Sequence, residues 1–351
     1  MQFYDRYTLI LVLSVFVALG VATLVGRILR GQVDNGMDPA IVAKFNRRVN
    51  AWWIMTAALA TAFLLGYSAT VILFGVISFW ALREFITLTP TRIADHRALF
   101  WVFFIFTPLQ FILVGMRREP LYSILIPVYA FLFIPARVAF AGDFKRFLER
   151  TAKIQAGLMI CVYCLSYAPA ILSLDEQQIA MNSPTAEIAP VVTAEANTPA
   201  VARPALNAQE RLTRNARLMF FFILIVQLGD VLHLAAEKLF GRYVIAPAIH
   251  QGRTWTGMLG GIGATTLLGM MFWWATPFNI FQVAILSFAT ALMGFAGGLT
   301  MSAIKRDRGV RDYGTLVEGH GGVLDRIDSI CFAAPVFFQV SKYIFYFSPP
   351  T

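Results

Sequence analysis

Apolar runs of about 20 residues recur along nearly the whole of this 351-residue chain. A helix of about 20 apolar residues spans the hydrocarbon core of a bilayer, where only helices and closed barrels satisfy their backbone hydrogen bonds. The composition agrees, because 58% of the residues are hydrophobic, 14% are charged and the mean hydropathy is +0.66. The sequence therefore predicts an all-α, polytopic integral membrane protein.

The apolar runs predict about ten transmembrane helices. Their approximate ranges are 7–29, 51–65, 67–85, 98–116, 121–141, 153–174, 216–237, 258–276, 279–301 and 329–347. Residues 51–85 allow two interpretations, either two short spans that turn at Gly66 or one long tilted helix. The first run is too long for the apolar region of a signal peptide and lacks a clear cleavage site, which favours a retained helix.

Lys and Arg are unevenly distributed between the two sides that ten spans would create. With the N-terminus outside, the inner segments are 27–48, 83–97, 137–153, 238–257 and 302–328, and they hold 21 of the 29 basic residues. Such a bias marks the cytoplasmic loops of membrane proteins. Topology thus explains the net charge of +9, which gives no reason to expect a nucleic-acid partner.

One predicted outer segment differs from the other loops. Residues 175–215 are rich in Ala, Pro, Thr and Glu and contain no aromatic residue. This composition is typical of a flexible extracytoplasmic loop. It divides the chain into an N-terminal transmembrane bundle, 1–174, and a C-terminal transmembrane region, 216–351.

The three cysteines, Cys161, Cys164 and Cys331, all fall within predicted spans. In an apolar helix, the C-x-x-C spacing places two small residues on one face. This favours helix packing over redox or metal chemistry.

Acidic and basic side chains concentrate in residues 302–328, which hold five of the 20 carboxylates together with five basic residues. A positive-inside anchor needs bases but no acids. Ser302, Lys305 and Arg306 share one helix face at i, i+3 and i+4. Asp325 and Asp328 place two carboxylates on one face of the next helix, where they would suit a hard divalent cation that also binds phosphates.

A glycine-rich stretch precedes these two aspartates. Gly319, Gly321 and Gly322 let backbone amides approach an anion closely. The segment therefore predicts a site where a metal and several cations hold phosphate groups. The alternative is purely structural, because aspartates favour the first turn of a helix and glycines favour turns.

The segment resembles the signature of the phosphatidate cytidylyltransferases, also called CDP-diacylglycerol synthases. The shared pattern is S-x-x-K-R, four residues, a base followed by Asp, and then H-G-G-x-x-D-R-x-D. Its residues in this chain are Ser302, Lys305, Arg306, Arg311, Asp312, His320, Gly321, Gly322, Asp325, Arg326 and Asp328. The wider resemblance covers roughly residues 216–347.

The chain departs from the family pattern upstream of this signature. Where the family has an Asp followed by Ala-Tyr, the chain has Asp230 and then His233 and Leu234. Where the family has Ser-Pro, Lys-Thr and Glu-Gly, the chain has His250, Gln251, Arg253, Thr254, Thr256 and Gly257. Arg311 also replaces the usual Lys, so the chain resembles a divergent member of the family.

The resemblance implies that CTP and phosphatidate are converted to CDP-diacylglycerol and pyrophosphate with a divalent metal, expected to be Mg²⁺. It implies metal ligation by Asp312, Asp325 and Asp328, with Asp230 as a further ligand. It also implies two sets of substrate contacts. Lys305, Arg306, Arg311, Asp312 and Arg326 would be catalytic, and Ser302, His320, Gly321 and Gly322 would complete the phosphate cradle.

These roles would make 216–351 the catalytic region, working among membrane lipids. The expected location is the bacterial inner membrane, with the active site facing the cytoplasm. The pattern leaves open whether the chain forms a homo-oligomer.

Two other functions fit part of the pattern. A CTP-dependent lipid kinase, or a synthase that uses another lipid phosphate, would keep the metal and triphosphate residues and change the acceptor pocket. A transporter of an anionic solute is less favoured, because its charges would lie near mid-membrane on broken helices. The charges in this chain cluster at one predicted membrane face.

Overall fold

The computed structural model describes residues 67–88, 91–174, 208–310, 313–314 and 322–347, together with scattered residues between 16 and 66. The predicted spans 7–29 and 51–65 lie partly outside the described residues. Most of the predicted 175–215 loop also lies outside them. Its last part is helical, because α11 begins at Ala208, so the loop boundary predicted at 215 is too late.

The described chain is almost entirely helical, which confirms the predicted all-α class. The N-terminal helices are α3 (Tyr67–Thr87), α4 (His96–Trp101), α5 (Thr107–Gly115), α6 (Glu119–Ile124), α7 (Phe131–Ala139), α8 (Phe147–Leu158) and α9 (Leu165–Ala170). The C-terminal helices are α11 (Ala208–Phe240), α12 (Trp255–Met271), α13 (Ile280–Asp307) and α14 (Leu324–Phe347). Short 3₁₀ turns occupy Ile93–Asp95, Ile171–Ser173 and Trp273–Ala275.

Two short strands, β1 (Val244–Ala246) and β2 (His250–Thr254), form an antiparallel hairpin between α11 and α12. In their register, Val244 pairs with Thr254 and Ala246 with His250. The hairpin was not predicted from the sequence. Two strands of three and five residues leave too short a pattern to distinguish from a polar loop.

Seven continuous helical segments in the described part of the chain are long and apolar enough to cross a membrane. They are Tyr67–Thr87, Ile93–Gly115, Glu119–Ala139, Phe147–Ser173, Thr213–Phe240, Ile280–Asp307 and Leu324–Phe347. Each matches a predicted span. The predicted span 258–276 corresponds to α12, which is apolar but has only 17 residues. The chain is thus an integral membrane protein, and the number of about ten spans stays a prediction.

Three of the long spans contain wide π-helical turns, at Val102–Phe106, Leu125–Ala130 and Met159–Cys164. Pro127 lies within the second of these turns, and Pro108 follows the first. Proline lacks the backbone N–H and its ring crowds the carbonyl four residues earlier. A wide turn accommodates that clash while the helix continues through the membrane.

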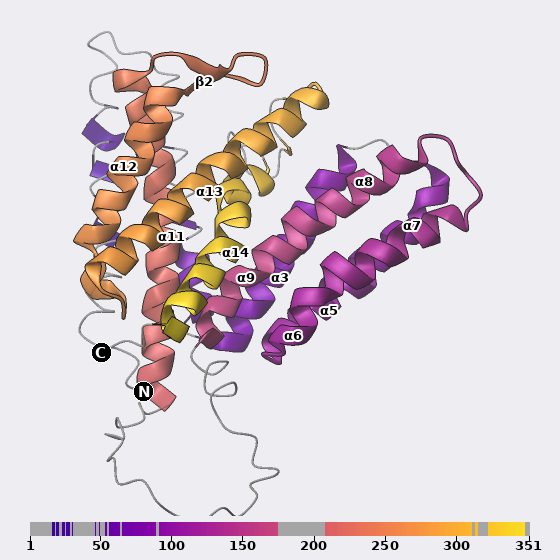
Figure 1. Ribbon diagram of the computed structural model, residues 1–351, viewed down its shortest axis with the longest axis horizontal. Helices are drawn as coiled ribbons and strands as arrows, with labels where there is room; N and C mark the ends of the chain where they lie inside the picture. Colours follow the sequence, from indigo (N-terminus) through magenta and orange to yellow (C-terminus); the bar gives the residue numbers. More distant parts are fainter. Residues whose placement is uncertain are drawn as a thin grey trace, which may run out of the picture.

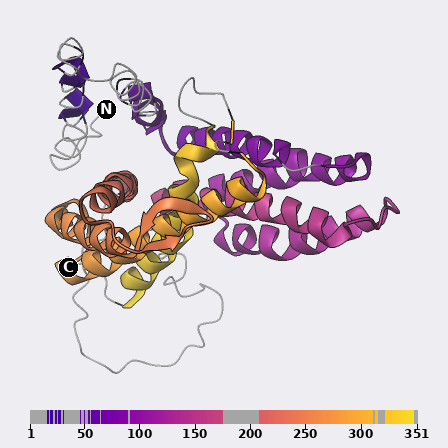
Figure 2. The ribbon, with the colours of Figure 1, turned by 90° about the horizontal axis from the view of Figure 1, so that it is seen from above.

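Helix α14 lies between two groups of helices (Figure 1). It packs against α13 and α11 on one side and against α9 and α3 on the other. Viewed from above, the two groups extend to opposite sides of α14 (Figure 2). A helix that carries predicted site residues is therefore held by both halves of the chain.

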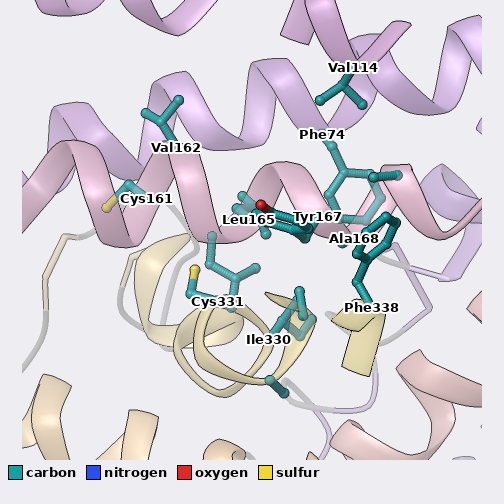
Figure 3. Close-up of a cluster of buried hydrophobic side chains, with 14 of the residues drawn as sticks. Phe74, Val114, Cys161, Val162, Leu165, Tyr167, Ala168, Ile330, Cys331 and Phe338 are labelled. Atoms are coloured by element: carbon teal, nitrogen blue, oxygen red, sulfur yellow. The ribbon is translucent and has the colours of Figure 1, made fainter. Parts of the chain in front are cut away.

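The contact between α14 and the N-terminal group is a continuous buried cluster (Figure 3). The ring of Phe338 on α14 meets that of Tyr167 on α9 edge to face, with centroids 5.2 Å apart. Cys161 and Cys331 are free, buried thiols within the cluster, as expected for a packing role. In a bilayer such close packing, and not hydrophobic burial, drives helices together.

Candidate active site

The residues predicted to bind phosphate lie where α13 ends and α14 begins. Helix α13 extends to Asp307, beyond the predicted boundary at 301, so Ser302, Lys305 and Arg306 lie in its last two turns. Helix α14 begins at Leu324, which places Asp325 in its first turn. The two helix ends meet directly, because Lys305 Nζ lies 2.9 Å from Asp325 Oδ1.

Asp325 is the centre of a hydrogen-bond network. One carboxylate oxygen accepts the bond from Lys305, and the other accepts bonds from the backbone N–H groups of Tyr313, at 2.8 Å, and Gly322, at 3.0 Å. The ion pair is largely buried, since the Lys305 and Asp325 side chains are 18% and 8% exposed. Asp325 therefore joins α13, α14 and two points, Tyr313 and Gly322, of the segment between them.

A second pair of carboxylates meets between α11 and α14. Ser329 donates a hydrogen bond from its hydroxyl to Asp230 Oδ1 at 2.8 Å, and the same hydroxyl lies 3.5 Å from Asp328 Oδ1. Ser329 also donates its backbone N–H to Asp328 at 2.8 Å. Asp230 and Asp328 thus both lie against the hydroxyl of one serine.

Arg253 extends from β2 toward these two aspartates. Its guanidinium lies 3.3 Å from Glu237 Oε1 on α11 and 4.9 Å from the ring centroid of Phe295 on α13. The charge of Arg253 acts on both Asp230 and Asp328. An ion pair and a cation–π contact therefore fix one cation beside two carboxylates.

The hairpin that carries Arg253 is fixed at its base and at its tip. At the base, Thr256 Oγ1 donates to Phe240 O at 2.6 Å and accepts the N–H of Arg242 at 2.7 Å. At the tip, Arg306 Nε donates to Ile249 O at 3.2 Å. Thr256, which stands where the related family has Glu, thus serves the local fold.

His250 and Tyr313 border the site outside the membrane spans. Burial, and then the positive charges of Arg253, Arg306 and Lys305, lower the pKa of His250. Its Nδ1 accepts the N–H of Gly252 at 3.1 Å, which leaves the proton of the neutral ring on Nε2. Burial, and then the charge of Asp325, raise the pKa of Tyr313, whose hydroxyl donates to Met301 O at 3.0 Å.

The structure brings together part of the predicted set. Lys305 and Asp325 are in direct contact, and Asp230 and Asp328 meet through Ser329. Ser302 turns its hydroxyl back to Gly298 O, at 2.7 Å. Arg326 lies half-buried in the first turn of α14. Arg311, Asp312, His320 and Gly321 lie outside the described residues.

Three charged residues at the site were not among the predicted ones. Arg253 and Glu237 form the ion pair beside the aspartates, and Glu84 on α3 accepts backbone hydrogen bonds at the start of α14. Arg253 stood out in the sequence only as a family departure. Glu84 was the one carboxylate in the predicted span 67–85, next to Arg83, and an ionisable residue within a span is a signal of function.

In the described part of the chain, only part of a ligand set for a divalent metal is present. No group of three or more His, Cys, Asp or Glu side chains is arranged there to hold a metal ion. Asp230 and Asp328 are the best candidates for metal ligands. Their two carboxylates interact electrostatically, and a cation between them would offset that repulsion. Mg²⁺ is often held by one or two carboxylates together with substrate phosphates, so these two residues fit its chemistry.

The fold and the site together define a polytopic membrane protein that gathers cations and carboxylates at one end of its helices. A sequence profile described as the cytidylyltransferase family matches residues 46–344. The chain therefore belongs to the cytidylyltransferase family and is a nucleotidyltransferase. The matched residues include the segment 302–328.

Individual relatives divide into a full-length and a partial group. The chain is 29% identical over 337 residues to the uncharacterized protein YnbB of Escherichia coli K12, which covers 95% of this chain and 98% of that protein. It is 35% identical over 136 residues to a phosphatidate cytidylyltransferase of Haemophilus influenzae, covering 37% of this chain and 46% of that enzyme. A phosphatidate cytidylyltransferase of Staphylococcus epidermidis matches at 33% over 129 residues, 36% of this chain and 50% of that enzyme. The matched region thus spans half or less of these two enzymes.

Proposed function

We propose that the protein is a membrane cytidylyltransferase that converts CTP and phosphatidate to CDP-diacylglycerol and pyrophosphate. The observation that supports this most directly is that two groups of charged side chains, Lys305–Asp325 and Asp230–Ser329–Asp328, both involve the first two turns of α14. Two named relatives are phosphatidate cytidylyltransferases. A site of this kind gathers the charges that a triphosphate and a lipid phosphate require.

In the proposed reaction, an oxygen of the lipid phosphate attacks the α-phosphorus of CTP. The bond between the α-phosphorus and the bridging oxygen breaks, and pyrophosphate leaves with the electron pair. The attacking phosphate is already anionic, so the site needs no strong general base. Positioning and charge neutralisation provide most of the rate enhancement in such transfers.

The cations of the site are assigned to the phosphates. Lys305 and Arg253 are held in place by Asp325 and Glu237, so they meet the substrate with little loss of side-chain freedom. We assign Arg306, Arg311 and Arg326 to further phosphate contacts, and Ser302, His320, Gly321 and Gly322 to the phosphate cradle.

Metal ligation is assigned to Asp328 and Asp230, with Asp312 as a further ligand. Mg²⁺ bound there would neutralise charge on the phosphate oxygens of CTP. Asp325 was also predicted as a ligand, and its carboxylate already accepts three hydrogen bonds. We therefore assign Asp325 the additional role of ordering the segment between α13 and α14.

Transfer of the α-phosphorus distinguishes this function from related CTP-dependent reactions. Purified protein with Mg²⁺ and phosphatidate is expected to move label from the α-position of CTP into the lipid and to release pyrophosphate. A CTP-dependent lipid kinase would move the γ-label and release CDP. The measurement is thin-layer analysis of the lipid product with α- and γ-labelled CTP in parallel.

The outcomes of this assay are distinct. Label in the lipid only from the γ-position would reject the cytidylyltransferase and support a kinase at the same phosphate site. Binding of CTP without any transfer to phosphatidate, but with transfer to another lipid phosphate, would assign a different acceptor. Absence of CTP binding would favour an anion transporter.

We further propose that the site faces the cytoplasm of a bacterial inner membrane, as the basic inner segments suggest. Lys145, in the α7–α8 connection, is exposed at the predicted inner side. Met116, between α5 and α6, is 64% exposed at the predicted outer side. In a background without native cysteines, Met116→Cys is expected to react with an impermeant maleimide in intact cells and Lys145→Cys only after lysis. The reverse labelling pattern would invert the topology.

A further inference from the structure

We propose that Glu84, on α3 of the N-terminal group, is a positioning residue for the active site: its carboxylate fixes the start of α14 and thereby Asp325 and Asp328. The proposal rests on the function proposed above, because it assigns Glu84 a part in ordering that same site. It also extends the site beyond the C-terminal region to which the sequence signature belongs.

The carboxylate of Glu84 caps α14 from a distant part of the chain. The N–H of Val323 donates to Oε1 at 3.0 Å and the N–H of Leu324 donates to Oε2 at 2.9 Å, so each oxygen accepts one backbone amide. The first N–H groups of a helix have no partner within the helix, and a nearby side chain usually supplies one. Here the partner is Glu84, which precedes Val323 by 239 positions and Leu324 by 240.

Glu84 is buried, at 4% exposure. A buried carboxylate is costly unless its oxygens are hydrogen-bonded. The two amides therefore stabilise Glu84, and Glu84 in turn stabilises one position of the helix start.

The backbone N–H of Gly322 extends this set of hydrogen bonds by one residue. Gly322 donates its N–H to Asp325 Oδ2, so three successive amides, 322 to 324, are bound by two carboxylates. A Cβ at position 322 would overlap the carboxylate of Glu84. The backbone at position 322 thus lies so close to the Glu84 carboxylate that only glycine fits there.

Helix α3 also contacts the segment between α13 and α14 at Tyr313. The ring of Tyr313 stacks on Phe85, the residue next to Glu84, with centroids 6.5 Å apart. Tyr313 donates its N–H to Asp325. Phe85 and Glu84 therefore contact the segment between α13 and α14 at two places, near residue 313 and near residue 323.

This arrangement has a functional consequence because Asp325 and Asp328 lie in the first two turns of the helix that Glu84 caps. A displacement of about 1 Å at a reacting centre costs on the order of 100-fold in rate. A change at Glu84 should therefore reduce turnover even though Glu84 lies on a different group of helices.

The test compares Glu84→Gln with Glu119→Gln. Both remove a buried carboxylate from the N-terminal group, since Glu119 is 7% exposed. Glu119 pairs with Lys342 at 2.6 Å, near the C-terminal end of α14, so it is a matched control for general stability. Glutamine at position 84 keeps one acceptor but turns an NH₂ group toward the second backbone N–H.

Two measurements are made on the full chain in lipid nanodiscs. Hydrogen exchange of residues 322–324 is expected to be at least 10-fold faster in Glu84→Gln and unchanged in Glu119→Gln. With α-labelled CTP, kcat per folded molecule is expected to fall about 10- to 100-fold in Glu84→Gln, with KM for CTP changed less than about 3-fold. If Glu84 only stabilised the fold, Glu84→Gln would lower thermal stability and yield, and kcat and KM per folded molecule would not separate in this way.

Wild-type exchange at 322–324 in Glu84→Gln would overturn the proposal, as would faster exchange with unchanged kcat. If the wild-type protein transfers no label from CTP, the proposed function fails. The exchange measurement then still decides whether Glu84 holds the start of α14.

Discussion

Asp328→Asn is expected to lower turnover about 100- to 1000-fold while leaving the fold intact. Asp328 faces Asp230 across the Ser329 hydroxyl, and its only other described hydrogen bond is a local one from the N–H of Ser329. An amide keeps the shape and one acceptor oxygen but removes the charge that a metal–nucleotide complex would need. The measurement is kcat with α-labelled CTP over a magnesium titration, alongside thermal unfolding.

The control is Asp307→Asn, which removes a carboxylate from the same end of the helices. Asp307 is 67% exposed and pairs with the adjacent Arg308, so its loss is expected to change turnover less than about 2-fold. Near-wild-type turnover of Asp328→Asn at saturating magnesium would reject the metal assignment. It would support the alternative in which the aspartates only favour the helix start.

Local sequence was sufficient to predict most of the fold. A transmembrane helix needs only a continuous apolar run, so each of the seven long spans in the described chain could be recognised without its neighbours. Boundaries were less accurate, because α13 continues to Asp307 through a charged turn that no longer resembles a span. The short β1–β2 hairpin was missed, since it is held together by Thr256 and Arg306 and not by a hydrophobic pattern of its own.

The site was predictable only where its partners are close in sequence or belong to a known signature. The contact between Lys305 and Asp325 joins two parts of one 27-residue segment, and the signature contains both residues. The contact of Glu84 with Val323 and Leu324 depends on how α3 packs beside α14, which no local pattern determines. Arg253 and Glu237 likewise meet only because the hairpin folds back over α11.

The position of α14 between the two groups of helices explains why a signature confined to the C-terminal half needs the rest of the chain. Its first turn is capped by Glu84, its middle packs against α9, and Lys342 near its end pairs with Glu119. The N-terminal group is therefore more than a membrane anchor. The N-terminal group contacts both ends of the helix that carries Asp325 and Asp328, and so positions that helix.

Lys305→Ala is expected to lower kcat/KM for CTP about 10- to 100-fold, which corresponds to a charge-assisted hydrogen bond of about 1.5–3 kcal/mol. The side chain of Lys305 is largely buried beside Asp325, so its ammonium is positioned before substrate binds. Asp325 would still accept the N–H groups of Tyr313 and Gly322 in the variant. The loss should therefore reflect a missing phosphate contact and not a disordered segment.

The control is Lys145→Ala, which removes an exposed lysine and is expected to leave kcat/KM unchanged. Combining Lys305→Ala with Asp325→Asn separates two roles of the lysine. If Lys305 acted only by holding Asp325, the double variant would be no worse than Asp325→Asn alone. A direct phosphate contact predicts a further loss in the double variant, because the triphosphate then lacks a cation that no other change restores. An unchanged kcat/KM for CTP in Lys305→Ala would remove this lysine from the substrate site.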